Sequence, residues 1–177
     1  MTDDPPQDHV ARLIALRRRE TPMIPLDGME ILSRARRLDQ LSRFWIEPVF
    51  EKHGLDTGEF DVLASLQRIG PPYALRPTEL YRSLMITSGG LTDRLNRLAG
   101  KELVRRVADP SDGRSLRVEL TPLGLKTIRA AFEEDMRTEA ELLAALTPGE
   151  RKTLARLLGK ILAVLERRRE EADREQG

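Results

Sequence analysis

The chain has 177 residues, of which 40% are hydrophobic and 33% charged, and its 30 Lys and Arg residues nearly balance its 29 Asp and Glu residues. This composition excludes a disordered chain, and the near-zero net charge means that any affinity for nucleic acid must depend on where the charges lie. With no cysteine, two distant histidines, no apolar run of the roughly 18 residues that span a bilayer and no signal-peptide core, we expect a cytoplasmic protein without metal, cofactor or membrane partner.

The first part of the chain predicts three helices. Residues 9–20 have apolar side chains at helical spacing and end in consecutive basic residues. Residues 27–53 repeat the pattern over a longer stretch, in which Pro48 should bend or end the helix. Asp56 or Thr57 then caps a third helix. We therefore expect a short N-terminal helix followed by two helices of the main body.

The middle of the chain predicts a helix-turn-helix. A short helix should begin at Pro77, since proline suits the first helical position, and end near Leu84. A second helix, capped by Thr87 or Ser88, should run to about Lys101. A separation of about three residues between two helices is typical of a helix-turn-helix.

Beyond residue 102 the apolar pattern changes from helical spacing to alternation, which predicts a β-hairpin. Leu116, Val118 and Leu120 alternate with polar residues and should form a half-buried strand, with residues 103–107 as its antiparallel partner. The polar residues 108–114 between the two strands predict a tip that is longer than a tight turn.

Two long helices are expected after the hairpin. Thr121 and Pro122 cap the first, and residues 147–150 form a capping box with proline at the first position of the second. The second helix carries apolar residues at steps of four, three and four, which is typical of a coiled-coil-like seam. The seam consists of Leu154, Leu158, Ile161 and Leu165.

The order of these elements predicts a mainly α fold with a small antiparallel β-wing, that is, a winged helix-turn-helix core flanked by N- and C-terminal dimerisation helices. Residues 57–121 should form the DNA-binding domain, residues 27–56 and 122–172 the helical dimerisation region, and residues 1–26 an N-terminal extension with a short amphipathic helix. The helical arms are too long and apolar for the small core to cover, so we expect a two-fold homodimer.

Several motifs in this region resemble those of the multiple antibiotic resistance regulator (MarR) family. They are residues 75–80 (LRPTEL), 88–98 (SGGLTDRLNRL), 109–115 (DPSDGRS) and 118–124 (VELTPLG). The similarity covers roughly residues 30–165. It implies a homodimeric transcription factor that binds palindromic operators, most such proteins being repressors that a small phenolic or anionic ligand releases.

Two features bear on how far the resemblance extends. Glu102 stands where the family usually has a glycine before the first wing strand. The N-terminal extension is similar to that of the urate-responsive branch, in which an aspartate and an arginine match Asp61 and Arg94. That branch also has a tryptophan on the added helix, whereas the only tryptophan here is Trp45. The ligand of that branch is therefore not carried over.

On the expected recognition helix, Leu91, Leu95 and Leu98 share the face that points to the core, and Asp93 and Asn96 lie on the opposite face. Near the N-terminus of such a helix, an aspartate can accept from a cytosine amine and an asparagine can pair with adenine. The alternative is that these residues are only the solvated face of a buried helix.

Basic residues extend the predicted DNA-binding surface. Arg97 flanks the outward face and can reach guanine or phosphate, and Arg114 at the wing tip suits a narrow minor groove. Arg105, Arg106 and Arg117, on or beside the wing, are phosphate candidates or simply solvated strand charges. The candidate DNA contacts are Ser88, Gly89, Gly90, Thr92, Asp93, Asn96, Arg97, Arg105, Arg114 and Arg117.

A second group of residues predicts a ligand site. Arg94 lies about 60° from the core-facing direction of the recognition helix and can reach back to Asp61 on the helix before it. Phe44, Trp45 and Phe60 are candidates for an apolar pocket beside this pair. The plainer interpretations are a structural ion pair and aromatic residues of the core.

The sequence favours a DNA-binding transcriptional regulator, most simply a repressor of nearby genes released by a small aromatic or anionic effector. No catalytic motif and no convincing histidine–carboxylate constellation is present, so we do not expect an enzyme. The alternative is a winged-helix module for protein–protein contacts, which would not bind duplex DNA in a salt-dependent way.

Overall fold

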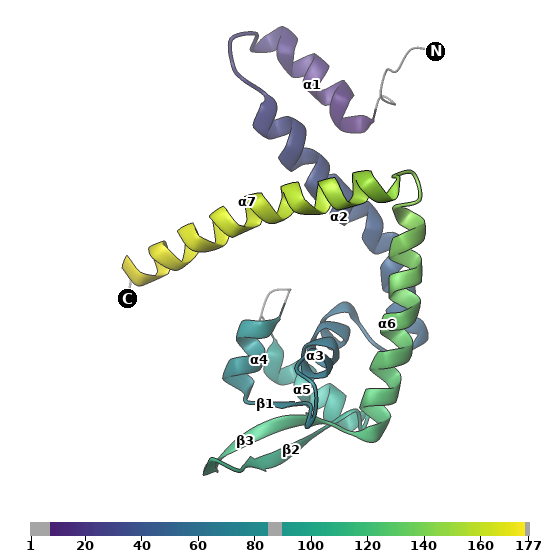
Figure 1. Ribbon diagram of the computed structural model, residues 1–177, viewed down its shortest axis with the longest axis vertical. Helices are drawn as coiled ribbons and strands as arrows, with labels where there is room; N and C mark the ends of the chain where they lie inside the picture. The colour runs from purple at the N-terminus through teal and green to yellow at the C-terminus, as the bar shows by residue number, and fades with distance from the viewer. Residues whose placement is uncertain (1–7, 85–89, 176–177) are drawn as a thin grey trace. The chain divides into compact units, whose positions relative to one another are not determined.

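The computed structural model describes residues 8–84 and 90–175, apart from the side chains of Gly113 and Arg114 (Figure 1). The chain forms two compact units, residues 1–135 and 136–177. Both units are helical, and the first also contains a small antiparallel sheet. Among the described residues, no helix has the length and apolar character needed to cross a membrane. The predicted fold class, mainly α with a small antiparallel wing, is confirmed.

The first three helices form where the sequence predicts them. They are α1 (His9–Glu20), α2 (Asp27–Lys52) and α3 (Thr57–Arg68). Pro48 lies inside α2 and does not end it, because the helix continues to Lys52. Asp56 is the N-cap of α3, because its side chain accepts a hydrogen bond from the backbone N–H of the third helical residue. The other predicted cap, Thr57, is the first residue of the helix.

The N-terminal helix α1 packs on α2. Val10 and Ile14 are its buried residues, and they lie one turn apart on the same face. Asp8 caps α1 and also forms an ion pair of 2.8 Å with Arg34 of α2. The predicted amphipathic helix of the N-terminal extension therefore has a packing partner within its own chain.

The helix-turn-helix consists of α4 (Pro77–Ser83) and α5 (Leu91–Gly100). The predicted caps of the second helix, Thr87 and Ser88, lie outside the described residues, and α5 is instead preceded by Gly90 as its N-cap. Gly90 has a φ of +76°, a left-handed conformation that glycine adopts without strain. The described recognition helix therefore begins at Leu91, directly after a glycine in the left-handed conformation.

Three strands form the wing and its support. They are β1 (Ala74–Leu75), β2 (Val104–Asp109) and β3 (Asp112–Leu120), all antiparallel, with β3 in the centre. The sequence did not predict β1, because two residues are too few for an alternating pattern. The pairing of β1 with β3 connects the start of α4 to the wing.

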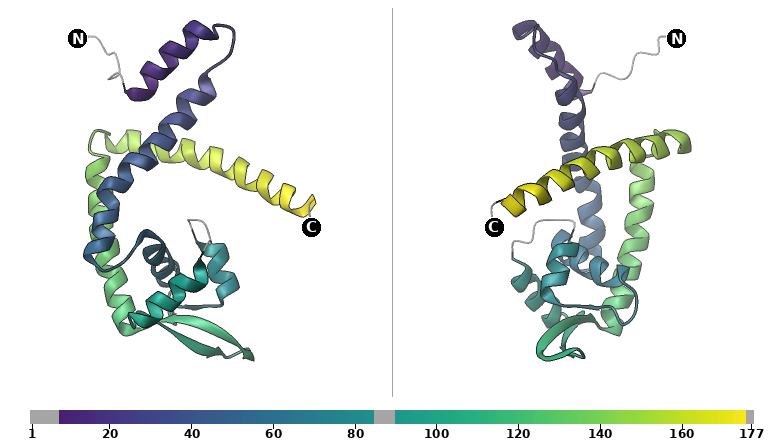
Figure 2. Two further views of the ribbon diagram at one scale, coloured as in Figure 1. Left: turned by 180° about the vertical axis from the view of Figure 1, so that it is seen from behind. Right: turned by 60° about the vertical axis from the view of Figure 1, so that its left-hand side comes forward.

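The hairpin tip is shorter than predicted. Only Pro110 and Ser111 separate the strands, because the buried side chain of Asp109 accepts hydrogen bonds from the backbone N (2.9 Å) and hydroxyl (2.7 Å) of Ser111. Leu116 is 52% exposed and not half-buried as predicted, whereas Val118 is buried. Leu116 pairs with Ala108, close to the tip of the hairpin, and this tip extends beyond the helices of its unit (Figure 2).

A tight junction joins α5, the wing and α6 (Pro122–Leu142). Glu102 has a φ of +57°, the left-handed conformation for which glycine is better suited. The hydroxyl of Thr121 donates to the Glu102 carbonyl at 2.7 Å and accepts from the backbone N of Gly124 at 2.9 Å. A Cβ at Gly124 would collide with the carbonyl of Leu103, so only glycine fits there. The predicted cap of α6 is confirmed by these bonds.

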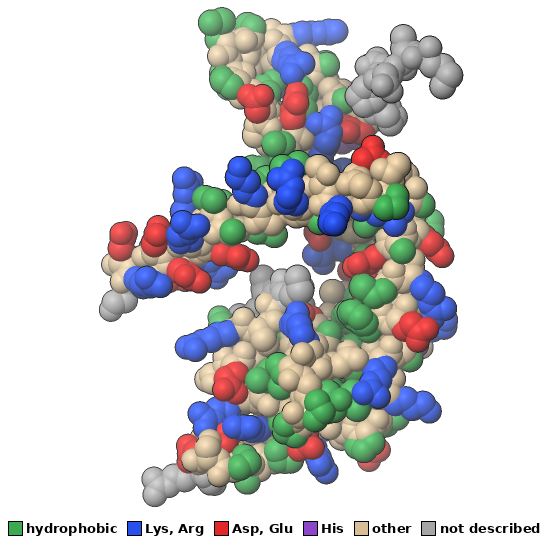
Figure 3. Space-filling model, viewed as in Figure 1, with side chains coloured by type: hydrophobic (Ala, Val, Ile, Leu, Met, Phe, Trp, Pro, Cys, Tyr) green, Lys and Arg blue, Asp and Glu red, His purple; other side chains and the backbone are tan. Residues whose placement is uncertain are grey.

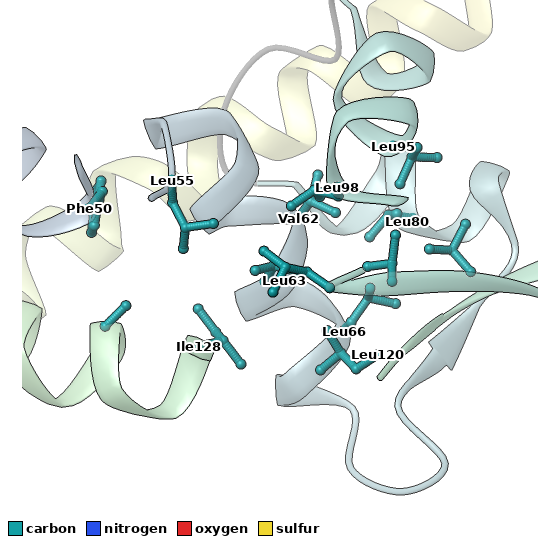
Figure 4. Packing of buried hydrophobic residues seen from close by; sticks show 14 of the residues in the cluster. Phe50, Leu55, Val62, Leu63, Leu66, Leu80, Leu95, Leu98, Leu120 and Ile128 are labelled. Atoms are coloured by element: carbon teal, nitrogen blue, oxygen red, sulfur yellow. The ribbon is translucent and has the colours of Figure 1, made fainter. Parts of the chain in front are cut away.

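The core of the first unit is built around α3, whose Val62, Leu63 and Leu66 are fully buried. Helices α2, α4, α5 and α6 and strand β3 supply the side chains around them (Figure 4). Such close packing fixes the helix-turn-helix and the wing relative to α3. The other labelled residues of this cluster are Phe50, Leu55, Leu80, Leu95, Leu98, Leu120 and Ile128.

The second unit contains the long helix α7 (Pro148–Glu175). The predicted capping box forms, because Thr147 and Glu150 bond reciprocally through side chains and backbone. Within its described residues α7 buries no side chain, and Leu154, Leu158 and Leu165 of the predicted seam are 38%, 37% and 49% exposed. Hydrophobic and basic side chains both reach the surface along this helix (Figure 3).

Candidate nucleic-acid interface

The outward face of α5 presents polar side chains to solvent. Thr92, Asp93 and Asn96 are exposed, whereas Leu95 and Leu98 are buried in the core. This division follows the helical period, because residues three or four apart share a face. The structure therefore places the predicted base-reading residues on one accessible surface near the start of the helix.

A cation from the wing adjoins this surface. Arg106 of β2 donates from Nη2 to Oδ1 of Asn96 at 2.8 Å. Arg106 pairs with the buried Val118 across the hairpin, and paired residues point to the same side of a sheet. Arg106 is therefore on the side of the sheet that faces α5, where its charge lies beside the predicted base-reading residues.

Arg97, which the sequence places on the flank of the outward face, forms ion pairs with residues at the start of α3. Its Nη2 is 2.6 Å from Oδ2 of Asp56, and its Nε is 3.1 Å from Oε1 of Glu59. These contacts raise the pKa of Arg97, chiefly through the hydrogen bond to Glu59. Arg97 thus connects α5 to the start of α3 through carboxylates that are distant in the sequence, and a direct contact of Arg97 with DNA stays a prediction.

Arg94 lies on the α3 side of α5. A Cβ built at Gly58 would be 2.7 Å from Cζ of Arg94, so the guanidinium occupies the space above that glycine. This position agrees with the inward direction that the helical angle predicts. Asp61 is on the same helix as Gly58 and is buried. An ion pair between Asp61 and Arg94 stays a prediction.

The base of the wing is organised by the buried carboxylate of Asp109. Besides its bonds to Ser111, it accepts a hydrogen bond from Nε of Arg76 and lies 3.0 Å from Nε of Arg117. Arg76 is the residue before α4 and also donates to the Ser111 hydroxyl at 2.9 Å. The hydrogen bond from Arg76 is the largest of several interactions that lower the pKa of Asp109 far below its ordinary value. One carboxylate thus ties the helix-turn-helix to the wing.

The remaining residues that the sequence predicts to contact DNA lie in several different places. Arg105 pairs with Glu119 at 2.7 Å and lies on the opposite face of β2 from Arg106, since neighbouring residues of a strand alternate. Arg117 is held by Asp109, as described above. The backbone of Arg114 belongs to β3, whereas its side chain, and Ser88 and Gly89 altogether, lie outside the described part of the structure.

The three aromatic residues of the predicted ligand pocket have different surroundings. Phe44 and Trp45 are 72% and 58% exposed and contact each other edge to face, with ring centroids 5.2 Å apart. Phe60 instead stacks on Phe50, with centroids 3.9 Å apart. Helical spacing did not distinguish the exposed side of α2 from the side that packs on α3.

The sequence did not indicate three residues whose ion pairs connect α5 or the wing to other elements: Arg76, Asp109 and Glu59. A signal was present for Glu59, because Asp56 and Glu59 have the spacing of a capping box. No comparable local signal identifies Asp109, whose partner Arg76 lies 33 residues away. Its position in the motif DPSDGRS predicts a turn but not a buried ion pair.

The geometry defines a class of protein. A helix-turn-helix whose second helix has an exposed polar face, followed directly by a two-stranded hairpin with basic residues, is a winged helix-turn-helix.

Comparison with known proteins identifies the family. Residues 53–115 match the MarR family model. The chain is 33% identical over 152 residues to the HTH-type transcriptional regulator PecS of Dickeya dadantii, covering 86% of this chain and 92% of that protein. It is 32% identical over 141 residues to the multiple antibiotic resistance protein MarR of Salmonella typhimurium, covering 79% of this chain and 92% of that protein.

A solved structure of a MarR mutant from Escherichia coli in complex with operator DNA is also similar, with a TM-score of 0.65 and 27% identity, over 80% of this chain and 96% of that one. The chain therefore belongs to the MarR family of winged helix-turn-helix transcriptional regulators, and it is not an enzyme. The family resemblance in the sequence is confirmed.

The contacts of Asp109 predict a pH-dependent contribution to stability. Its pKa in the folded protein lies below the ordinary value of 3.8, so its ion pairs stabilise the fold above about pH 4 and lose that effect as the pH falls below it. We expect Asp109→Asn to lower the thermal midpoint at pH 7, and the difference from wild type to narrow between about pH 4 and pH 2.

Circular dichroism melts of both proteins over this pH range test the prediction. Asp39→Asn, which alters an exposed pair on α2, is the control and should change the midpoint little at any pH. A constant difference between Asp109→Asn and wild type at all pH values would show that the ionisation of Asp109 does not stabilise the fold.

Proposed function

We propose that the protein is a homodimeric repressor that binds palindromic double-stranded DNA through α5 and the wing, and that a small anionic or aromatic ligand releases it. The observation that carries the proposal is the exposed face of α5 with Arg106 beside it. A recognition helix that offers Asp93 and Asn96 to base edges, with an adjoining cation for phosphate, has the chemistry of major-groove readout.

The distribution of charge supports DNA as the partner. The whole chain has a net charge of only +1, yet residues 76–118 contain nine basic and five acidic residues. The positive excess is therefore concentrated in the helix-turn-helix and wing, where a polyanion would lie. The similarity to a MarR structure with bound operator DNA supports the same mode of binding.

Exposed apolar faces support a homodimer. On α7 the three leucines of the seam are exposed, and α2 exposes Ile31, Leu38 and Leu41 at helical spacing. Exposed apolar faces of this extent are typical of protein interfaces, and two-fold dimers are the commonest assembly. Such a dimer presents two copies of α5, which suits a palindromic operator.

A link between the core and the recognition helix supports ligand control. The guanidinium of Arg94 rests on the first turn of α3, and Asp61 is buried one turn further along the same helix. An anionic ligand that competes for Arg94 would change how α5 packs on α3. Small shifts of a recognition helix are sufficient to change base readout.

Duplex binding tests the DNA-binding proposal. Wild-type protein would first select a duplex from a randomised pool, and each variant would then be titrated with this duplex and a scrambled one at several salt concentrations. Asn96→Ala should weaken binding to the selected duplex by about 1–3 kcal/mol with little effect on the scrambled one. Arg106→Ala should weaken both and reduce the salt slope by about one.

Arg43→Ala, an exposed arginine paired with Asp39 on α2, is the control and should bind both duplexes like wild type. If wild-type protein shows no salt-dependent duplex binding, the protein is instead a winged-helix module for protein contacts.

The seam on α7 predicts how the dimer is held together. Replacing Leu158 and Ile161 together by Asp would bury charge in the interface and should give a monomer or an unfolded protein, whereas Lys160→Glu on the same helix should remain dimeric. Analytical ultracentrifugation with a thermal melt distinguishes these states. A stable monomer of the double variant that still binds the selected duplex would contradict this role for the seam.

Ligand control predicts separate effects of Arg94 and Asp61. Operator titrations with and without benzoate or phenylacetate should show a change in affinity of about 5- to 150-fold for wild type. Asp61→Asn should keep the fold and weaken this response, and Arg94→Ala should reduce the response more than the operator affinity. If Arg94→Ala abolishes DNA binding and leaves ligand binding intact, Arg94 faces the groove and the coupling mechanism is wrong.

A further inference from the structure

Three basic residues on one side of α5 contact the first turn of α3 or the residues just before it. Arg94, Arg97 and Lys101 follow one another at intervals of three and four residues, so they share one side of the helix. Arg94 lies above Gly58, Arg97 reaches Asp56 and Glu59, and Lys101 donates to the Gly54 carbonyl at 2.9 Å. This side differs from the outward face and from the leucine face that enters the core.

Glu59 is at the centre of these contacts. Its side chain is 1% exposed, and both oxygens are used: Oε1 accepts from Nε of Arg97 at 3.1 Å, and Oε2 accepts from Nζ of Lys101 at 2.7 Å. Oε2 also accepts from the backbone N of Asp56 at 3.0 Å, which completes the capping box of α3. A buried carboxylate needs such partners, since leaving it unpaired is strongly unfavourable.

The capping box therefore has a second role. The carboxylates of Asp56 and Glu59 each use one oxygen within the box and another for Arg97 of α5. The bonds that begin α3 and the bonds that hold α5 thus share the same two side chains. The rotation of α5 about its axis is determined by this contact together with the buried leucines Leu95 and Leu98.

The rotation of α5 decides which side chains reach DNA. The side chains of a helix end roughly 5 Å from its axis, so a rotation of about 20° moves them by about 2 Å. This displacement exceeds the range of distances that hydrogen bonds to bases tolerate. A loss of the contacts on one side of α5 would therefore disturb the alignment of Asp93 and Asn96 on the other.

We propose that Glu59 is a positioning residue for base readout: its buried carboxylate, by holding Arg97 and Lys101, sets the orientation in which α5 meets the bases. This inference rests on the proposed DNA-binding function and deepens it. Glu59 contacts no DNA itself and determines discrimination between sequences, not general affinity for duplex DNA.

A direct contact of Arg97 with DNA would give a different result from a contact that only holds α5 in place. If Arg97 binds phosphate, its removal weakens binding to every duplex equally and lowers the salt slope by about one. If Arg97 is held by Glu59, its removal lowers the preference for the selected duplex and leaves the salt slope unchanged. The two roles thus give different results in the same titration.

The experiment is a double-mutant cycle with Glu59→Gln and Arg97→Gln. The selected and scrambled duplexes described above are titrated at several salt concentrations with wild type, both single variants and the double variant. We expect each single variant to lose about tenfold in the ratio of the two affinities, comparable to the effect of one mismatched base pair. Because both changes remove the same contact, the double variant should lose about tenfold and not about a hundredfold.

Glu150→Gln is the matched control, because it removes the glutamate of the capping box that begins α7, in the other unit of the chain. It should lower the thermal midpoint slightly and leave the affinity ratio at the wild-type value. If Glu59→Gln does not fold, Arg97→Gln still tests the proposal, because the side chain that it replaces is 48% exposed. The two readouts are the ratio of the affinities for the two duplexes and the salt slope.

Unchanged ratios in the folded variants, multiplicative losses in the double variant, or a lower salt slope for Arg97→Gln would overturn the proposal. Failure of wild-type protein to select any duplex would instead contradict the proposed function, so the two failures are distinguishable.

Discussion

The buried carboxylate of Glu59 is the constraint on which the arrangement of the recognition helix depends. A charge that is withdrawn from water requires fixed partners, and here those partners are Arg97 of α5 and Lys101, the residue directly after this helix. The leucines of α5 enter the core on a neighbouring side, so the side opposite the core remains open to solvent. The residues that remain on that side, among them Asp93 and Asn96, have the chemistry of base recognition.

The wing is held by the same physical means. Asp109 is buried at the end of β2 and binds Arg76, which precedes α4, so the hairpin is anchored to the helix-turn-helix through one carboxylate. The recognition helix and the wing are thus each held by an ion pair between a buried carboxylate and an arginine of a different element. Arg76 and Arg97 are therefore both engaged in ion pairs within the protein.

Local signals in the sequence predicted most of the fold, whereas contacts between distant residues could not be predicted. The caps formed by Asp56, Thr121 and Thr147 involve residues three apart, and a pattern of this length is visible in the sequence. The helical angle also indicated that Arg94 points inward. The same angle could not reveal that the guanidinium of Arg97 binds Glu59, which lies 38 residues away in the sequence. Nor could helical spacing show that Phe44 and Trp45 are exposed while Phe50 stacks on Phe60.

The most direct test of this account is a crystal structure of the protein with the duplex that it selects. The account predicts that Arg97 remains within hydrogen-bond distance of Glu59 in the complex while Asp93 and Asn96 face base edges in the major groove. A structure in which Arg97 leaves Glu59 and binds a phosphate, with the duplex contacted through the α3 side of α5, would contradict it.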